Sequence, residues 1–346
     1  MGQRTELLGW DKGDLREGPV GSEADVGRQL PAERGDHPFR WIRHSQDAYH
    51  MELRRKAALT TLRVCNEGGY MSDGGRVAIE WIPAMEKLTC LVRAPESLPM
   101  SKGRCVTRLH DCCDRNPADI AEERARAGAQ VALVSAASAY HAGGGFEAGG
   151  RHALEESLNV QSTLFLSLKR AESLARGYIP VPSFARPPQP RHGGEWQCYI
   201  PDRGVILSPD VEFFRGGCES GYAFRPFATR VVAVISVAMP NCNPEMSDAP
   251  VDRPPDDQQY TDLLRGKCAA IVLAAVKAKA RTLVMPAAGC NVYGNDPEAV
   301  GGALGWVLAR CFPEALDEVY LTGDIRFCEA VTRAVSANSV DSSGGV

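Results

Sequence analysis

The chain has 346 residues, of which 44% are hydrophobic, and a formal net charge of -4 at pH 7. It is long enough to bury a core as one large or two modest domains. Its basic residues are scattered, which argues against duplex DNA as a partner, and no apolar run reaches the ~20 residues of a membrane-spanning helix. The polar N-terminus lacks a secretory signal, so we expect an intracellular protein, cytoplasmic or nuclear, without membrane contact.

The first third of the chain changes from a polar segment to a folded region. Residues 1–40 are rich in Gly, Glu, Asp and Arg without periodicity, which predicts disorder. Residues 44–66 show helical spacing of apolar side chains. Asn116 as N-cap, a proline directly after it and Gly128 beyond the end predict a helix over 117–127. Short strands are expected at 77–81, 88–92 and 106–109.

Strands and helices alternate in the rest of the chain. Residues 131–134 form a buried strand and 151–176 have helical spacing, whereas 180–194, rich in Pro and Gly, indicate a surface insertion. The further expected elements are strands at 204–208, 230–237, 283–285 and 318–322 and helices at 260–280 and 296–311. This order predicts a three-layer α/β/α domain.

The twelve cysteines indicate no framework of disulfides or metal ligands. They are spread over the chain and include no Cys-x-x-Cys pair. His110, Cys112 and Cys113 form the one tight cluster, and a closed zinc site needs four well-spaced ligands. We therefore expect neither a metal nor a cofactor.

A triple glycine, Gly143-Gly144-Gly145, lies between the buried strand at 131–134 and the following helix. Glycine accepts positive φ and lets the backbone approach a ligand closely. Glu155 and Glu156 open the helix soon afterwards. Because ligands of open α/β sheets bind at the carboxyl ends of strands, this loop and the two acids are a candidate site.

A second glycine-containing loop follows the strand at 283–285 and leads into a helix that begins at Asp296-Pro297. Its members are Gly289, Cys290, Asn291, Val292, Tyr293, Gly294 and Asn295. The free N–H groups of a helix start suit a phosphate, although a plain connection between strand and helix explains the pattern too. Two such loops at one end of adjacent parallel strands can hold a diphosphate between them, with Tyr293 over an adjoining ribose.

These segments together resemble one known family. The order Ser135-Ala136-Ala137-Ser138-Ala139, then the triple glycine, then Glu155-Glu156-Ser157 is similar to the signature of the microbial-type poly(ADP-ribose) glycohydrolases (PARG), a branch of the macrodomains. Residues 206–215 resemble the family's strand with a Ser-Pro-Asp-Val turn, and 289–297 resemble its second phosphate loop. The match is collinear from about His44 to Ala334.

The resemblance implies a macrodomain-like three-layer α/β/α fold with a mixed sheet and an N-terminal helical extension. The expected domain covers 41–336, with an accessory part at 41–103, a core at 104–336 and a flexible tail at 337–346. Its implied activity is hydrolysis of the ribose–ribose O-glycosidic bond of poly(ADP-ribose), which releases ADP-ribose. Implied partners are poly(ADP-ribose) or ADP-ribosylated proteins and ADP-ribose itself, bound by a monomer.

The resemblance also implies roles for individual residues. Glu156 corresponds to the acid that protonates the leaving ribose oxygen, and Glu155 to the neighbour that helps to hold the ribose. A general acid must keep its proton near neutral pH, so we expect burial, Glu155 and the ligand phosphates to raise the pKa of Glu156 against the pull of the helix N-terminus. The implied ligand-binding residues are Ser138, Gly143, Gly144, Gly145, Phe146 and the second loop, Gly289 to Asn295.

Two other functions stay open at this point. One is a module that binds ADP-ribose without hydrolysing it, which Leu154 favours because the family usually carries Gln there. The other is hydrolysis of a single ADP-ribose from a protein or nucleic acid.

Overall fold

The structure is a computed structural model, and it describes residues 48–150, 153–175, 198–246 and 249–340. The segments expected to be disordered (1–40) and inserted (180–194) lie outside the described residues. Helix α9 (Ile325–Val340) continues past residue 336, where we expected the folded domain to end.

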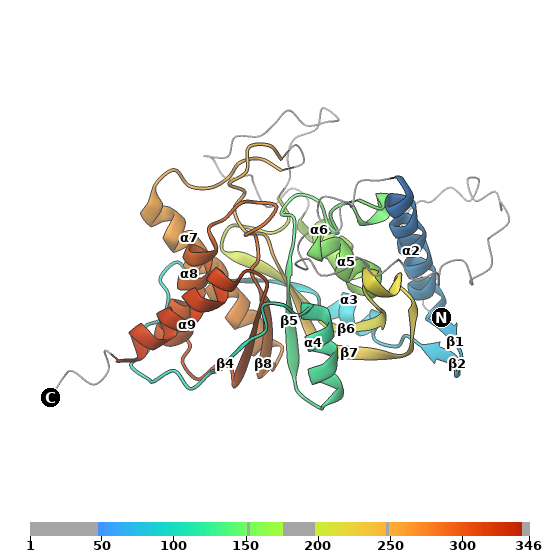
Figure 1. Cartoon of the computed structure of the whole chain (residues 1–346), viewed down its shortest axis with the longest axis horizontal. Helices are drawn as coiled ribbons and strands as arrows, with labels where there is room; N and C mark the ends of the chain where they lie inside the picture. Colours follow the sequence, from blue (N-terminus) through green and yellow to red (C-terminus); the bar gives the residue numbers. More distant parts are fainter. Residues whose placement is uncertain (1–47, 151–152, 176–197, 247–248, 341–346) are drawn as a thin grey trace.

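A seven-stranded mixed sheet forms the middle of the molecule (Figure 1). The strands β7, β5, β8, β9 and β4 run parallel to one another, whereas β6 pairs antiparallel with β7, and β3 pairs antiparallel with β6. Their order across the sheet is β3 (Cys90–Arg93), β6 (Gly204–Arg215), β7 (Phe224–Val237), β5 (Val131–Ala136), β8 (Thr282–Pro286), β9 (Glu318–Thr322) and β4 (Arg108–Asp111). The predicted mixed α/β class is confirmed.

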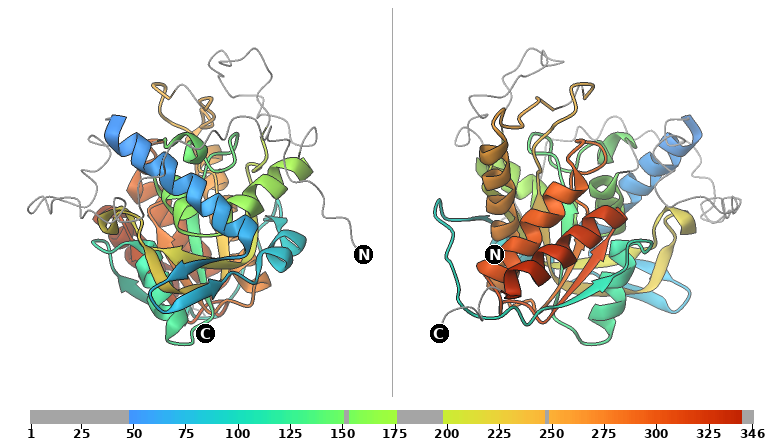
Figure 2. Two further views of the ribbon diagram at one scale, coloured as in Figure 1. Left: turned by 90° about the vertical axis from the view of Figure 1, so that its right-hand side faces the viewer. Right: turned by 60° about the vertical axis from the view of Figure 1, so that its left-hand side comes forward.

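Helices cover both faces of this sheet (Figures 1 and 2). One layer consists of α7 (Asp257–Lys277), α8 (Pro297–Arg310) and α9, and the other of α3 (Ile82–Leu88), α4 (Pro117–Arg126), α5 (Leu154–Gln161) and α6 (Leu164–Ala175). Helix α2 (Ala48–Glu67) lies outside the second layer, and a small hairpin of β1 (Gly69–Ser72) and β2 (Gly75–Ala78) follows it. The expected N-terminal helical extension is present.

Strand β5 shows why the sequences of the central strands are continuous apolar runs. Ala132 and Val134 pack into the core under α7 and α8, whereas Val131 and Leu133 pack into the core under α4 and α5. All four side chains are fully buried. A parallel strand with helices on both faces needs apolar residues at every position, not at alternate ones.

The prediction of one continuous helix over 151–176 is wrong. The structure has two helices, α5 and α6, separated at Ser162, whose backbone is extended with φ -148° and ψ -178°. Ser162 pairs with Phe213 of β6, and the Thr163 N–H donates to the Glu212 carbonyl at 3.1 Å. The chain therefore leaves the helix because it forms hydrogen bonds with the sheet at this point, which apolar periodicity does not reveal.

The strand expected at 204–208 and the turn expected after it are one long strand, β6. Pro209 pairs with Ala233, and Val211 pairs with Val231. Asp210 between them takes a positive φ of 52°, and its carboxylate accepts a hydrogen bond from Arg230 at 2.7 Å. The Pro-Asp pair therefore ends neither the strand nor its register with β7.

The proposed division of the domain stays a prediction, but the described residues add one fact. Strand β3 lies within the expected accessory part, 41–103, and it forms the edge of the main sheet by antiparallel pairing with β6. Among the described residues, no helix is both long and apolar enough to cross a lipid bilayer.

Glycines allow α8 and α9 to pack in close contact. A Cβ added to Gly305 would lie 2.5 Å from the Val331 carbonyl oxygen and 2.7 Å from the Ala334 Cβ. A Cβ added to Gly301 would lie 2.5 Å from the Phe327 carbonyl oxygen. Gly302, one position further on, has no atom within 4 Å of such a Cβ.

We expect Gly305→Ala to lower the free energy of unfolding by about 1 to 3 kcal/mol, because the added methyl overpacks the contact between α8 and α9. Gly302→Ala is the matched control, and we expect it to raise the free energy of unfolding by ~0.5 to 1 kcal/mol, because alanine favours the helix. Urea unfolding of both variants measures the two effects. Equal stability of the two variants would contradict the close packing.

Candidate active site

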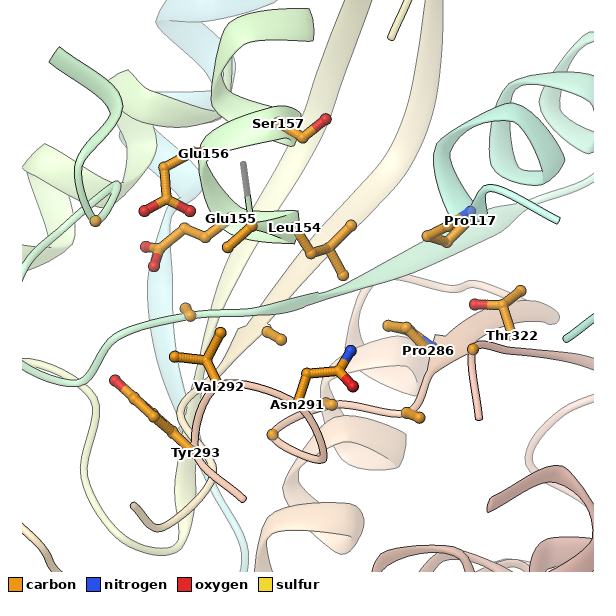
Figure 3. Close-up of a pocket in the computed structure, with 18 of the residues that line it drawn as sticks. Pro117, Leu154, Glu155, Glu156, Ser157, Pro286, Asn291, Val292, Tyr293 and Thr322 are labelled. Atoms are coloured by element: carbon orange, nitrogen blue, oxygen red, sulfur yellow. The ribbon is translucent and has the colours of Figure 1, made fainter. Parts of the chain in front are cut away.

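A cavity of about 640 Å³ opens at the carboxyl ends of the parallel strands. The last residues of four neighbouring strands or the positions just after them line it: Ala136 and Ala137, Val237, Pro286 and Thr322. Figure 3 shows the start of α5 on one side of this cavity and the second glycine loop on the other. Both predicted loops therefore lie where α/β sheets bind their ligands.

The first glycine loop, described at residues 137–150 and 153, uses its triple glycine to hold the two acids. The Gly143 N–H donates to Glu155 Oε1 at 2.9 Å, and the Gly145 N–H donates to Glu156 Oε1 at 2.9 Å. The Gly144 N–H donates to the His141 carbonyl at 3.0 Å. All three N–H groups therefore have protein acceptors.

Gly144 cannot be replaced by a larger residue without moving an acid. Its φ is 57°, and an added Cβ would lie 2.4 Å from Glu156 Oε1 and 3.4 Å from Glu155 Oε2. Glycine is required here both for the left-handed backbone and for the close approach of backbone to carboxylate. The sequence pattern of three glycines followed by two acids is thus one structural unit.

Glu155 is the buried acid of the pair, with 4% of its surface exposed. Its Oε2 accepts a hydrogen bond from the Ser138 N–H at 2.8 Å, so both carboxylate oxygens hold the first glycine loop. Burial, and next the charge of Glu156, raise the pKa of Glu155 well above its usual value, and the two N–H donors oppose this shift. Glu155 is therefore placed to hold the loop, with its own charge disfavoured by burial.

Glu156 is more exposed and lines the cavity with Leu154 and Ser157 (Figure 3). Both acids lie in the first turn of α5, where the helix dipole favours negative charge. The side chains of Glu155 and Glu156 lie on the same side of the cavity, opposite Tyr293 of the second loop. The predicted catalytic pair is therefore brought together at one end of the cavity.

The second glycine loop, residues 287–296, presents backbone donors to the same cavity. Gly289, Asn291, Val292 and Tyr293 line it. Within the described parts of the chain, the N–H groups of Gly289, Asn291 and Val292 have no hydrogen-bond acceptor. Successive N–H groups of this kind form a concavity that suits an anion.

Asn295 stabilises the second loop from the interior of the protein. Its amide nitrogen donates to the carbonyls of Pro240 and Gly289 at 2.8 Å and 3.0 Å, and its amide oxygen accepts from the Tyr260 hydroxyl at 2.8 Å. With 2% of its surface exposed, Asn295 lies in the interior and does not line the cavity. It shapes the loop instead.

Some of the other expected ligand-binding residues line the cavity, and others do not. Ser138, Gly144 and Gly145 line the cavity, whereas Gly143, Phe146, Cys290 and Gly294 do not. Phe146 is buried and packs against Phe165 with ring centroids 4.6 Å apart. The Ser138 hydroxyl accepts the N–H groups of Tyr140 and His141, both at 3.2 Å, and so forms the turn of the first loop.

Sequence reasoning missed the end of the cavity that lies away from the acids. Pro117, Pro286 and Thr322 form this end (Figure 3). The Thr322 hydroxyl is buried and has no hydrogen-bond partner among the described residues. The rule that neighbouring parallel strands end at one edge could have identified this region, because Thr322 ends β9 and Pro117 follows β4.

Cys218 and Glu219 also line the cavity, and no sequence signal indicated them. They belong to the short 3-10 helix η3 (Cys218–Ser220) between β6 and β7. A second 3-10 helix, η2 (Phe146–Ala148), follows the triple glycine directly. Contributions of this kind depend on the path of the chain in three dimensions.

Helix α2 holds the first loop and α5 from outside. The Arg54 Nε donates to the Gly149 and Gly150 carbonyls at 3.1 Å and 2.7 Å, and the Thr61 hydroxyl donates to the Val160 carbonyl at 2.6 Å. A Cβ added to Gly149 would lie 2.1 Å from the Met51 carbonyl oxygen. The N-terminal extension therefore contacts both ends of the segment that carries the acids.

The described residues include no group of three His, Cys, Asp or Glu side chains arranged to hold a metal ion. All twelve cysteines are free thiols. The second loop offers the N–H groups of Gly289, Asn291 and Val292, which suit an anion.

Fold and site together define a macrodomain-like α/β domain with paired acids beside two glycine loops. Residues 58–216 match the family model described as "Microbial-type PARG, catalytic domain". This segment therefore belongs to the family of microbial-type PARG catalytic domains, as the resemblance implied. None of the curated protein sequences compared with the chain matches it.

Solved structures extend the likeness beyond that segment. The poly(ADP-ribose) glycohydrolase of Thermomonospora curvata is 25% identical, with a TM-score of 0.62, and the match covers 82% of this chain and 99% of that one. The same enzyme bound to the inhibitor ADP-HPD matches at a TM-score of 0.60, with 25% identity over 82% of this chain and 99% of that one. The enzyme of Deinococcus radiodurans in complex with ADP-ribose is 22% identical over 75% of this chain and 98% of that one, with a TM-score of 0.53, and supports the fold.

The raised pKa of Glu155 predicts how its contribution to stability depends on pH. Unfolded glutamates have a pKa of about 4.3, so above this pH folding takes up a proton at Glu155. Stability therefore falls as pH rises toward the raised native-state pKa, by up to ~1.4 kcal/mol per pH unit. Glu155→Gln does not titrate, so we expect the stability of the unsubstituted protein relative to this variant to fall from about pH 4 upward.

Urea unfolding of both proteins between about pH 4 and pH 8 measures this difference. Glu147→Gln, at an exposed position of the same loop, is the control for a change in net charge. A difference between the unsubstituted protein and Glu155→Gln that stays constant with pH would show that Glu155 is ionised throughout.

Proposed function

We propose that the protein hydrolyses the ribose–ribose O-glycosidic bond of poly(ADP-ribose) and releases ADP-ribose, with Glu156 as general acid and base. One observation carries the assignment to Glu156: its carboxylate lines the cavity, and the Gly145 N–H fixes its Oε1 at 2.9 Å. The family of residues 58–216 and the inhibitor-bound relative support the substrate class.

The contacts of the two loops support a different role for each loop in holding the ligand. The triple-glycine N–H groups already donate to Glu155, Glu156 and His141, so they hold the acids. The second loop has N–H groups of Asn291 and Val292 without an acceptor among the described residues, and it receives the diphosphate. In this proposal the triple glycine, which we expected to hold the diphosphate or the distal ribose, contributes through the two acids.

The rest of the ligand extends from the diphosphate in both directions. The distal ribose lies at the end with Glu155 and Glu156, and the adenosine lies at the end with Pro117, Pro286 and Thr322. Apolar walls and one buried hydroxyl suit a flat base with polar edges. A cavity of about 640 Å³ is within the range that binds small ligands.

The chemistry follows from the placement of one carboxyl. Glu156, protonated on the oxygen that Gly145 does not hold, gives its proton to the leaving ribose oxygen as the C–O bond breaks. The resulting ionised Glu156 then takes a proton from water as the water oxygen bonds to the oxocarbenium carbon. The proton lost in the first step returns in the second, so Glu156 ends as it began.

Leu154 favours a second candidate function, that of a module that binds ADP-ribose without hydrolysing it. Its side chain lines the cavity beside the acids, where the family usually carries the amide of Gln. An apolar side chain cannot donate a hydrogen bond to the ribose, whereas the backbone donors of the second loop are unaffected. Binding therefore depends less on position 154 than hydrolysis does.

We expect Glu156→Gln to lower the rate of ADP-ribose release from poly(ADP-ribose) by about 100-fold or more, because the amide cannot transfer a proton. ADP-ribose should still raise the melting temperature of this variant, because the second loop is unchanged. Release assays and thermal melts of both proteins measure these effects. Binding without release by the unsubstituted protein would favour the binding module, and failure to bind ADP-ribose would exclude both functions.

We expect Gly144→Ala to lower turnover by about 100-fold, because its Cβ would displace the Glu156 carboxylate from its position. Gly128→Ala is the matched control, since Gly128 also has a positive φ, 86°, but no atom within 4 Å of an added Cβ. Both variants should lose ~1 to 2 kcal/mol of stability from the left-handed backbone. Equal turnover of the two would contradict the role of Gly144.

A further inference from the structure

A third loop, between β7 and α7 and described at residues 238–246 and 249–256, contacts both glycine loops. It lies beside them because β7 pairs with β5, and β5 pairs in turn with β8. Met239 and Met246 of this loop line the cavity. The β7–α7 loop is therefore the one segment whose described residues bond to the first and the second glycine loop at once.

Its bonds to the second glycine loop fix two carbonyls. The Asn243 side chain donates to the Val292 carbonyl at 3.1 Å, and the Cys242 N–H donates to the Tyr293 carbonyl at 2.8 Å. The C=O and N–H groups of a trans peptide point in opposite directions. Fixing the carbonyls of Val292 and Tyr293 therefore also fixes the N–H groups of Tyr293 and Gly294. The Gly294 N–H donates to the Asn291 carbonyl at 3.2 Å, and the peptide of that carbonyl carries the Val292 N–H, so the constraint extends to this donor.

Its bond to the first glycine loop comes from Asp252. The Tyr140 hydroxyl donates to Asp252 Oδ2 at 3.0 Å. Tyr140 is 7% exposed and lies in the turn between Ser138 and the triple glycine. Asp252 is 9% exposed, so this bond is shielded from water.

Asn241 joins the two sides. Its N–H donates to Asp252 Oδ1 at 2.5 Å, and its side-chain oxygen accepts the Asn243 N–H at 2.9 Å. Its side-chain nitrogen donates to the Pro250 carbonyl at 3.1 Å. With 1% exposure, Asn241 lies at the centre of a continuous path of contacts that runs from Tyr140 through Asp252, Asn241 and Asn243 to Val292; its first three residues are buried and its last two are half-buried.

We infer that Asp252 and Asn241 are positioning residues that keep the two glycine loops in register with each other. Neither contacts the ligand in the proposed placement. They set the distance between the donors of the second loop and the acids held by the first loop. This inference rests on the proposed function for its effect on ligand binding, but the path itself exists without a ligand.

Tyr140→Phe tests the path by removing one hydroxyl. We expect it to weaken ADP-ribose binding about threefold to tenfold, which is the loss of one buried hydrogen bond. Tyr199→Phe is the matched control, because the buried Tyr199 hydroxyl has no partner among the described residues. We expect that variant to bind ADP-ribose as the unsubstituted protein does. Equal binding by the two variants would overturn the inference.

A double-mutant cycle with Asn243→Ala tests whether the two ends of the path act together. If they do, the double variant Tyr140→Phe/Asn243→Ala loses less affinity for ADP-ribose than the product of the losses in the two single variants. Added to Tyr199→Phe, it should give its full single effect. Losses that multiply in the first pair would overturn the inference. The change should appear mainly in KM, because the bonds between Glu156 and Gly145 are untouched.

Hydrogen exchange without a ligand separates this inference from the proposed function. The N–H groups of Gly294 and Asn295 are hydrogen-bonded within the second loop. Tyr140→Phe should speed their exchange although it lies in the other loop, and Tyr199→Phe should not. Unchanged exchange would overturn the path even if ADP-ribose binds, whereas faster exchange in a protein that fails to bind ADP-ribose would contradict only the proposed function.

Discussion

Three backbone N–H groups that donate to two carboxylates organise this site. Ser138 and Gly143 hold Glu155, and Gly145 holds Glu156. These bonds couple the conformation of the first glycine loop to the start of α5, so the loop and the acids cannot be placed independently. The absence of a side chain at Gly144 is what permits the approach.

Helix α2 holds this unit from outside. Helix α2 contacts the loop through Arg54 and the end of α5 through Thr61. Thr61 also accepts a hydrogen bond at 3.0 Å from Arg215, a guanidinium whose pKa is lowered to about 10 by burial between β6, β7 and α2. Burying such a charge is unfavourable unless every donor is satisfied, so this contact fixes α2 on the sheet specifically. The N-terminal extension is thus part of the site's support.

Sequence patterns predicted those features of the molecule that depend on residues close together in the chain. The buried strand of Val131, the N-cap Asn116, whose side chain accepts the Ala118 N–H at 2.9 Å, and the glycine loops are all signals within a few residues. The break at Ser162 and the cavity contributions of Glu219 and Thr322 depend on contacts between segments far apart in the chain. Sequence also could not tell which N–H groups of a glycine loop are already used, and this decides what the loop binds.

The charges of the cavity explain why backbone donors matter for the proposed reaction. Among the described residues that line it, Arg115 is the only arginine or lysine, whereas five are acidic: Asp114, Asp119, Glu155, Glu156 and Glu219. In the proposed placement, the diphosphate is held by neutral N–H groups of the second loop, and it keeps its negative charge because these donors carry no net charge. That charge then stabilises the positive oxocarbenium carbon as the glycosidic bond breaks. A site that bound the phosphates with several arginines would bind more tightly but would weaken this stabilisation of the transition state.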